Sequence, residues 1–222
     1  MHTHAAAFAT LTLTASALAG FTQIDETYFA GAPFVGVDPI GDLTDLPITV
    51  GFDFAPDGSP IGTPNNIGTP LFFSDPIDNV FAPVGLLIDP GSRAVSQPSN
   101  PAGIGAMSGV NTLASDIAAN PSGTIVFTFT NGVSAAGFFA LDGPTNEVSA
   151  AFYDMSGNLI TTLQPADPAT YHGIESDIAI GSIVIESSAS DDYYVENLSF
   201  INVPSPAALA LLAPTLAFRR RR

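Results

Sequence analysis

Short segments in which apolar and polar residues alternate recur through the middle of this chain, and residues that favour turns separate them. In the clearest segment, 125–129, every second residue is Ile or Phe. Alternation with a period of two is typical of a strand with one buried face. Asn131-Gly132 follows, and this pair is a strong hairpin signal because both central residues of a type I′ turn need positive φ. The pattern predicts a hairpin here, with 133–141 as its return strand.

Similar segments along the chain predict further strands. They cover residues 48–54, 80–88, 147–153, 159–163, 178–186 and 193–201. Segments rich in Pro and Gly predict long loops at 55–70 and 89–106, and a short helix is expected near 112–119. Short strands at this spacing, without helical periodicity, predict an all-β fold, a jelly-roll-like antiparallel β-sandwich.

The two ends of the chain differ from this middle part. Residues 5–18 are small and apolar, and they lead to Ala17-Leu18-Ala19, in which small residues flank the middle one as at a signal-peptidase site. We therefore expect a signal peptide over 1–19, with Ala17 and Ala19 as cleavage determinants and a mature chain starting near Gly20 or Phe21. The sandwich domain is expected over 20–202, flanked by the signal helix and a short apolar C-terminal helix.

Composition excludes several classes of function. The formal net charge of the 222 residues is −16, and there is no cysteine. Four of the five basic residues are at the C-terminus, so that the domain has Arg93 alone and no lysine. Nucleic-acid binding is not expected, because it requires cations that displace counterions from phosphates. Without cysteine, disulfides, thiolate metal sites and cysteine nucleophiles are excluded.

Few residues of the domain are suited to catalysis. His172 is the single histidine after the signal peptide, no G-x-S-x-G motif is present, and no serine is marked as its partner. We interpret His172 as a residue of a loop or a strand edge, and the chain as a non-enzyme. A glycan hydrolase that uses two carboxylates is an alternative, since such an enzyme needs only two suitably spaced acids.

Several carboxylates are candidates for binding calcium, which takes six to eight oxygen ligands in proteins. The candidate ligands are Glu26, beside Asp25, together with Asp191, Asp192, Glu196 and Asn197 near the last strand. Asp38, Asp42 and Asp45 form a further cluster. None of these matches the spaced calcium loop of EF-hands. The alternative is that these aspartates form turns by binding their own backbone.

The last twenty residues have an unusual order. Pro204, Ser205 and Pro206 precede twelve mostly apolar residues, 207–218, which end at four arginines, Arg219, Arg220, Arg221 and Arg222. This segment resembles the PEP-CTERM sorting signal of exopolysaccharide-producing bacteria, with Ser205 in place of glutamate and with Pro214 interrupting the apolar part. The resemblance implies transient membrane insertion of a tail, 203–222, and its processing by an exosortase-type enzyme. Segments 171–176 and 194–200 are similar to the closing strands of sandwich domains in that family.

These features together predict an exported protein of the cell surface or extracellular matrix, transiently anchored in the membrane through its C-terminus. The expected role is structural or adhesive, with extracellular polysaccharide as a partner. Tyr171, Tyr193 and Tyr194, expected in or near loops, are candidates for stacking on sugars. The alternatives are a calcium-stabilised lectin-like module and the glycan hydrolase described above.

Overall fold

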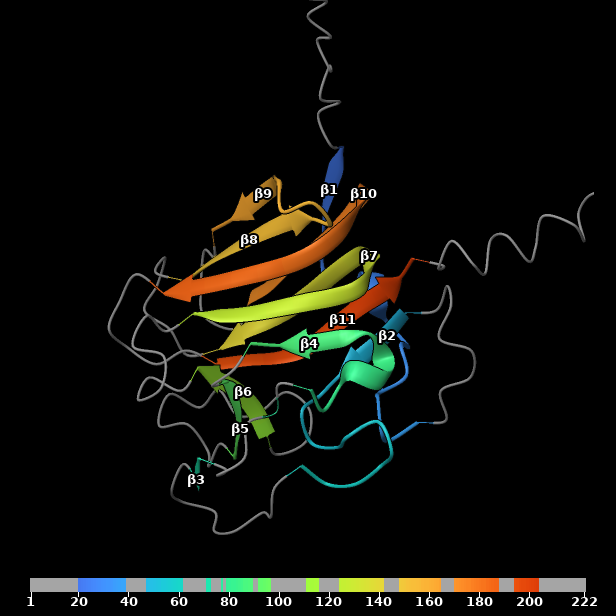
Figure 1. Cartoon of the computed structure of the whole chain (residues 1–222), viewed down its shortest axis with the longest axis vertical. Helices are drawn as coiled ribbons and strands as arrows, with labels where there is room; N and C mark the ends of the chain where they lie inside the picture. The colour runs from blue at the N-terminus through green and yellow to red at the C-terminus, as the bar shows by residue number, and fades with distance from the viewer. Residues whose placement is uncertain are drawn as a thin grey trace, which may run out of the picture.

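The computed structural model describes residues 20–38, 47–61, 71–72, 77, 79–89, 92–96, 111–115, 124–141, 148–164, 170–187 and 194–203. These residues form eleven strands and two short 3-10 helices (Figure 1). The strands are β1 (Phe21–Ile24), β2 (Pro47–Val50), β3 (Leu71–Phe72), β4 (Leu86–Ile88), β5 (Ser92–Ser96), β6 (Asn111–Ser115), β7 (Ile125–Leu141), β8 (Val148–Asp154), β9 (Leu159–Leu163), β10 (Thr170–Ser187) and β11 (Tyr194–Asn202). The helices are η1 (Glu26–Phe29) and η2 (Ala82–Val84).

All the strands are linked by antiparallel hydrogen bonding. The main path runs β3-β5-β6-β11-β7-β10-β8-β9, and β1, β2 and β4 pair with β10, β11 and β7 respectively. The two central strands, β7 and β10, are long, with 17 and 18 residues, and they pair along most of their lengths. They are the central strands of the fold, because each pairs with the other along one edge and with shorter strands along its opposite edge.

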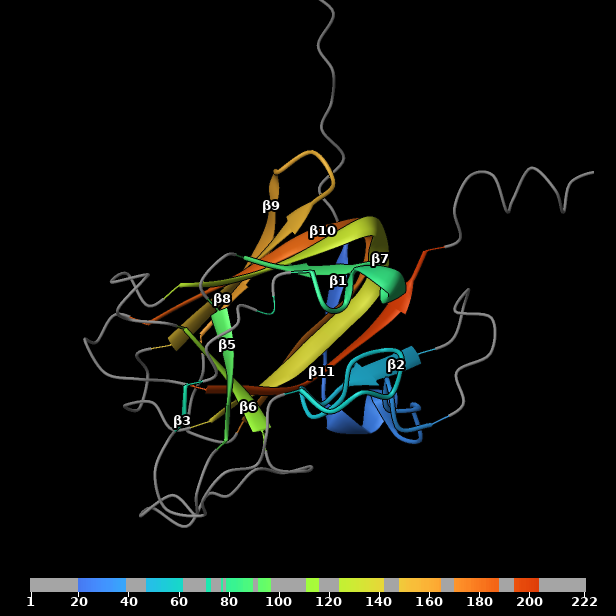
Figure 2. The ribbon, with the colours of Figure 1, turned by 60° about the horizontal axis from the view of Figure 1, so that its bottom comes forward.

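Both long strands bend in the middle, and this bend makes two layers (Figure 2). The pairing of β7 with β10 shifts register around Ile180, opposite Val133, and Gly132 has a φ of 74°. The predicted hairpin at Asn131-Gly132 is therefore wrong, because β7 continues through this pair. Positive φ at Gly132 bends the strand, and bulges in both partners keep the two halves of β7 on β10. Strands that bend in this way form the corners of a sandwich.

The hydrophobic core fills the space between the two layers. One layer contains β4, β8, β9, the first half of β7 and the second half of β10, and the other contains β2, β11, β1 and the remaining halves. Aromatic pairs connect the layers: Phe127 with Phe138 at a centroid distance of 6.4 Å, and Phe129 with Phe200 at 5.2 Å. All four side chains are almost fully buried. The predicted all-β sandwich is confirmed.

The predicted elements agree with the observed ones to different degrees. The strand predicted at 159–163 has the bounds of β9, and those at 147–153 and 193–201 differ from β8 and β11 by about one residue. The helix expected near 112–119 is wrong, because 111–115 are β6, paired with β5. β5 in turn lies within the predicted loop 89–106. These two strands are short and polar, so their sequences do not indicate strands. They are strands because they pair with each other.

Both ends of the chain lie outside the described residues. They include the cleavage determinants Ala17 and Ala19 and the whole sorting tail, that is, Pro204, Ser205, Pro206, Arg219, Arg220, Arg221 and Arg222. Within the described part of the chain, no helix has the length and apolar character needed to cross a membrane.

Candidate functional site

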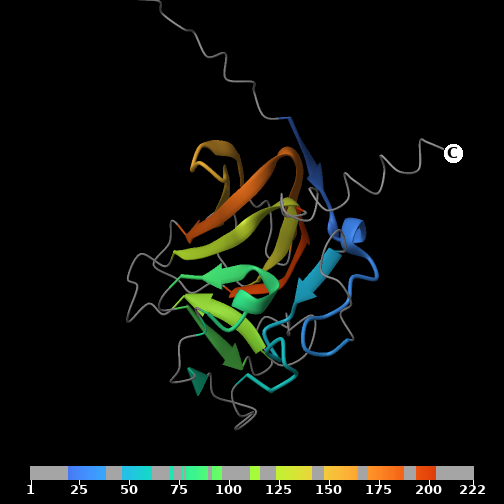
Figure 3. The same ribbon diagram turned by 45° about the vertical axis from the view of Figure 1, so that its right-hand side comes forward.

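A second, smaller hydrophobic cluster lies on the outer side of the layer that contains β11. Its buried members are Ile24, Phe29, Ala32, Ala135, Phe139 and Tyr171, and Tyr194 and Ile201 pack against it. The first three come from the N-terminal segment, in which β1 pairs with β10 and η1 follows directly (Figure 3). The N-terminal segment therefore covers part of a sheet face that would otherwise present aromatic side chains to solvent.

Two glycines allow Tyr171 to lie flat within this cluster. A Cβ on Gly137 would lie 2.6 Å from Cε1 of Tyr171, and one on Gly173 would lie 2.9 Å from the same atom. The ring therefore occupies the space over both glycines, an arrangement that protects glycine backbone in sheets. Tyr171, predicted to lie near a loop, is instead a buried residue of β10. Burial raises the pKa of its phenol far above the usual range.

A row of aromatic rings connects this buried cluster to the surface. Tyr28 packs edge-on against Phe29 at a centroid distance of 5.0 Å, Phe29 lies 6.4 Å from Tyr171, and Tyr171 lies 5.0 Å from Phe139. Phe29, Tyr171 and Phe139 are buried, whereas Tyr28 is 39% exposed. The exposed ring is thus held by a packed aromatic neighbour rather than standing free in solvent.

A carboxylate lies near the other end of the Tyr28 side chain. It belongs to Glu175, which is exposed on β10. Partial burial raises the pKa of the Tyr28 phenol, and the negative charge of the nearby Glu175 raises it further. Thr22, on β1, pairs directly opposite Glu175. We call Thr22, Tyr28 and Glu175 the Tyr28 surface.

The turn that positions Tyr28 depends on Asp25. An Asp25 oxygen accepts hydrogen bonds from the backbone N–H of Thr27, at 3.0 Å, and from its hydroxyl, at 2.5 Å. These bonds cap η1 and lower the pKa of Asp25, so the group stays ionised. The sequence analysis missed Tyr28 and Glu175. The Asp25-x-Thr27 capping pattern was the available signal for Tyr28, whereas only the pairing of β1 with β10 reveals Glu175.

His172 has a different environment from the one expected. It lies within β10, is almost fully buried and contacts the ring of Phe138 at a centroid distance of 5.8 Å. The interpretation as a loop or strand-edge residue is wrong. Its Nε2 atom has no hydrogen-bond partner, and burial lowers the pKa of the imidazole, so the ring is neutral in the core. A neutral ring enclosed in the core has no access to a substrate in solution.

The candidate calcium ligands are spread over several environments. Glu26 is the first residue of η1, Glu196 is fully buried in β11, and Asn197 has a φ of 51°. Asp191 and Asp192 lie outside the described residues. Among the side chains that the structure describes, no three of the types His, Cys, Asp and Glu are grouped as a metal site would require. Calcium binding stays a prediction.

Several aspartates serve as turn formers, which is the alternative given above for the cluster that includes Asp38. Asp38 accepts a hydrogen bond from the backbone N–H of Phe34 at 2.8 Å. Asp57 accepts hydrogen bonds from Ser59, and Asp154 from Asn158 and Ser156, and these bonds lower the pKa of both carboxyl groups. A glycosidase general acid needs a raised pKa, so Asp57 and Asp154 do not suit that role.

Comparison with known proteins adds little to this description. No protein-family model and no curated protein matches the chain. A solved structure of a mutant of CBM29-2, a family 29 carbohydrate-binding module, is similar with a TM-score of 0.30 and 10% sequence identity. The match covers 69% of this chain and 90% of that one.

Proposed function

We propose that this protein is exported to the cell surface or extracellular matrix, where it has a structural or adhesive role and binds polysaccharide at the Tyr28 surface. In this scheme the sandwich domain, 20–202, is the part of the chain that is exported. The segment 1–19 directs export, and the tail 203–222 is inserted transiently in the membrane and processed by an exosortase-type enzyme. The sequence of the two ends supports the route, and the geometry at Tyr28 supports the binding.

The observation that carries the binding proposal is the fixed, partly exposed ring of Tyr28. The ring packs edge-on against Phe29, and the Glu175 carboxylate lies near its hydroxyl. A preordered aromatic side chain loses little conformational entropy on binding. Its face suits the C–H groups of a sugar ring, while the carboxylate of Glu175 and the hydroxyl of Thr22 suit sugar hydroxyls.

The negative charge of the protein limits which polysaccharides can bind at the Tyr28 surface. Glu175 is part of the Tyr28 surface, and the chain as a whole has a formal net charge of −16. A surface of this sign repels polyanions. We therefore expect neutral polysaccharides, rather than uronate-rich or sulfated ones, to be the ligands.

The proposal is tested by binding of the purified exported chain to an array of neutral and acidic polysaccharides. Tyr28→Ala should weaken binding about tenfold or more, a change that corresponds to about 1.4 kcal/mol. Tyr28→Phe keeps the ring but removes the hydroxyl near Glu175, and should have a smaller effect. Phe54→Ala, at an aromatic residue that is similarly exposed, is the matched control and should bind as the parent does.

Two results would contradict this proposal in different ways. If Tyr28→Ala and the parent bind the same polysaccharides equally well, the Tyr28 surface is not the binding site. If the parent binds none of the polysaccharides, the carbohydrate role is excluded and a purely structural role remains.

A further inference from the structure

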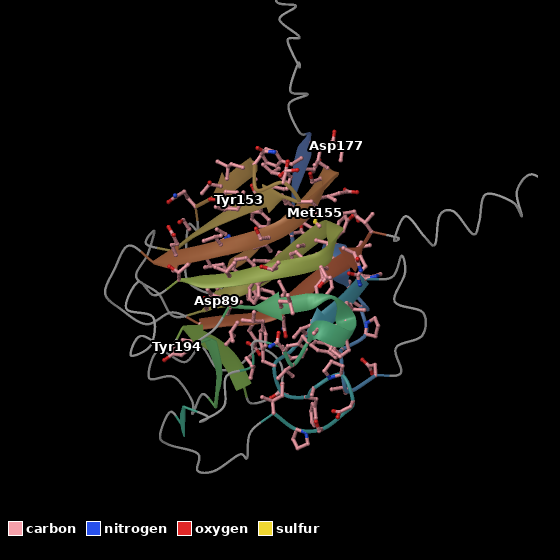
Figure 4. The ribbon with its side chains drawn as sticks, viewed as in Figure 1. Asp89, Tyr153, Met155, Asp177 and Tyr194 are labelled. Atoms are coloured by element: carbon pink, nitrogen blue, oxygen red, sulfur yellow. The ribbon has the colours of Figure 1, made fainter. Side chains whose placement is uncertain are left out.

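The first residue after the expected signal peptide lies against a carboxylate. Gly20 precedes β1, and its carbonyl oxygen accepts a hydrogen bond of 3.2 Å from the backbone N–H of Asp177. A Cβ on Gly20 would lie 2.9 Å from Oδ2 of Asp177. The carboxylate therefore occupies the space that a side chain at position 20 would need. Figure 4 shows Asp177 beside the start of β1, at the bend of β10.

We infer that cleavage after Ala19 frees an α-amino group at Gly20 that forms an ion pair with Asp177, so that the processed N-terminus becomes a fixed part of the sheet edge. This inference rests on the export step of the proposed function. The amino nitrogen is bonded to the Gly20 Cα at a distance of about 1.5 Å, and that carbon lies next to the Asp177 carboxylate. Before cleavage the same nitrogen is a neutral amide.

The composition of the domain makes this new charge unusual. Between residues 20 and 202 the only permanently charged basic side chain is that of Arg93, and the chain has no lysine. A free α-amine therefore adds a second positive charge to the domain, at a place where two carboxylates are near. Asp177 is adjacent to Gly20, and Glu175 lies opposite Thr22 of the same strand.

Among the described residues of β1, η1 and β10, the charged groups nearest the amine are both acidic. β10 contributes Asp177 and Glu175, η1 contributes Tyr28, which stays neutral, and β1 itself has no titratable side chain. Two negative charges stabilise the protonated amine. The ion pair would raise the pKa of the amine above that of a free α-amine, so the pair is present while the amine is protonated and is lost as the pH rises through that pKa.

Cleavage one residue later would remove this arrangement. A chain starting at Phe21 lacks the Gly20 carbonyl that accepts the hydrogen bond from Asp177. The proposed ion pair therefore requires Gly20 to be the first residue. Because β1 leads into η1, the anchored N-terminus also restrains the segment that positions Tyr28.

The absence of lysine permits a direct experiment. Reductive methylation of the exported, processed chain with ¹³C-formaldehyde labels only its α-amine, and the labelled methyl signal is followed by NMR as the pH is varied. The midpoint of this titration should lie about 0.3 to 0.7 pH units higher in the parent than in Asp177→Asn. This difference is the size expected of an exposed ion pair. Glu186→Gln, which changes an exposed acid near the C-terminal end of β10, is the matched control and should leave the midpoint unchanged.

Mass spectrometry of the same sample identifies the first residue and separates the possible failures. A first residue of Gly20 with equal midpoints in the parent and Asp177→Asn would overturn the ion pair and leave export intact. A first residue of Phe21 would overturn the inference as well. A chain that retains residues 1–19 would overturn both this inference and the export step on which it rests.

Discussion

At the scale of single residues, Tyr171 and His172 show how neighbouring positions in a strand take opposite roles. Consecutive side chains of a strand point to opposite faces of the sheet. Tyr171 belongs to the outer cluster that the N-terminal segment covers, and His172 contacts Phe138 in the core. The two residues are thus buried by different parts of the chain. His172 is the one whose protonation bears on stability, because its buried imidazole is kept neutral by desolvation.

We predict that stability falls as the pH is lowered from 7 to 5, and that His172 is the cause. Burial lowers the pKa of His172, so the unfolded chain binds a proton near its ordinary pKa of about 6.5 while the folded chain does not. The free energy of unfolding should fall by at most about 1.4 kcal/mol per pH unit. Urea unfolding at several pH values measures this fall, and His172→Phe should remove the part that His172 causes. If the free energy of unfolding has the same slope against pH in both proteins, the prediction is contradicted.

At the scale of elements, the bend shared by β7 and β10 determines where the other parts of the site lie. It brings 170–176 into the layer that contains β11, where β1 pairs with 173–176. The bend also brings β10 close to the turn after β8: a Cβ on Gly181 would lie 2.7 Å from the Asp154 carbonyl oxygen and 2.8 Å from the Met155 Cα. Both are backbone atoms, so they cannot move away by a change of rotamer.

We predict that Gly181→Ala destabilises the protein by about 2 kcal/mol or more, since overpacking against backbone forces the strands apart. The matched control is Gly157→Ala in the adjacent turn, where φ is 79° and no atom lies within 4 Å of the added Cβ. That substitution should cost only the strain of a left-handed alanine, about 1 kcal/mol. Thermal unfolding of both variants measures the difference, and equal losses would show that contact at the bend is unimportant.

At the scale of the whole molecule, the sandwich is an acidic domain between two segments of different character. Phe127 and Phe129 of one layer pack on Phe138 and Phe200 of the other, so both layers share one core. The apolar part of the tail, 207–218, has twelve residues and is interrupted by Pro214. A spanning helix needs about 20 residues. The tail is therefore poorly suited to permanent anchoring, and this is consistent with its removal.

We predict that the native protein, isolated from its producing cells, lacks both the first 19 residues and the four C-terminal arginines. Loss of the tail follows from its short apolar part and its resemblance to a processed sorting signal. Intact-mass measurement of the native protein tests both ends at once. A mature species that still ends in Arg222 would contradict the processing of the tail.

The sequence indicated the elements that depend on local pattern, and it was less accurate where pairing partners matter. β9 has the predicted bounds because its short run of Leu, Ile and Thr and the turn before it are local signals. Asn131-Gly132 carries the local signal of a hairpin, but only Gly132 has a positive φ, and β7 continues as one strand. Both halves of β7 find a partner in β10, a strand about 40 residues away in sequence, and no local pattern specifies that choice.

The sequence by itself determined the fold class, the acidic charge, the lack of lysine and cysteine, and the composition of the two ends. Periodicity, turn residues and charge are properties of short segments, and for this reason they can be read without coordinates. Only the tertiary structure decided that His172 is in the core, that Tyr28 lies beside Glu175, and that Gly20 lies beside Asp177. These relations depend on which strands pair across the sheet, because β1 and β10 are separated by more than a hundred residues and meet only in the folded protein.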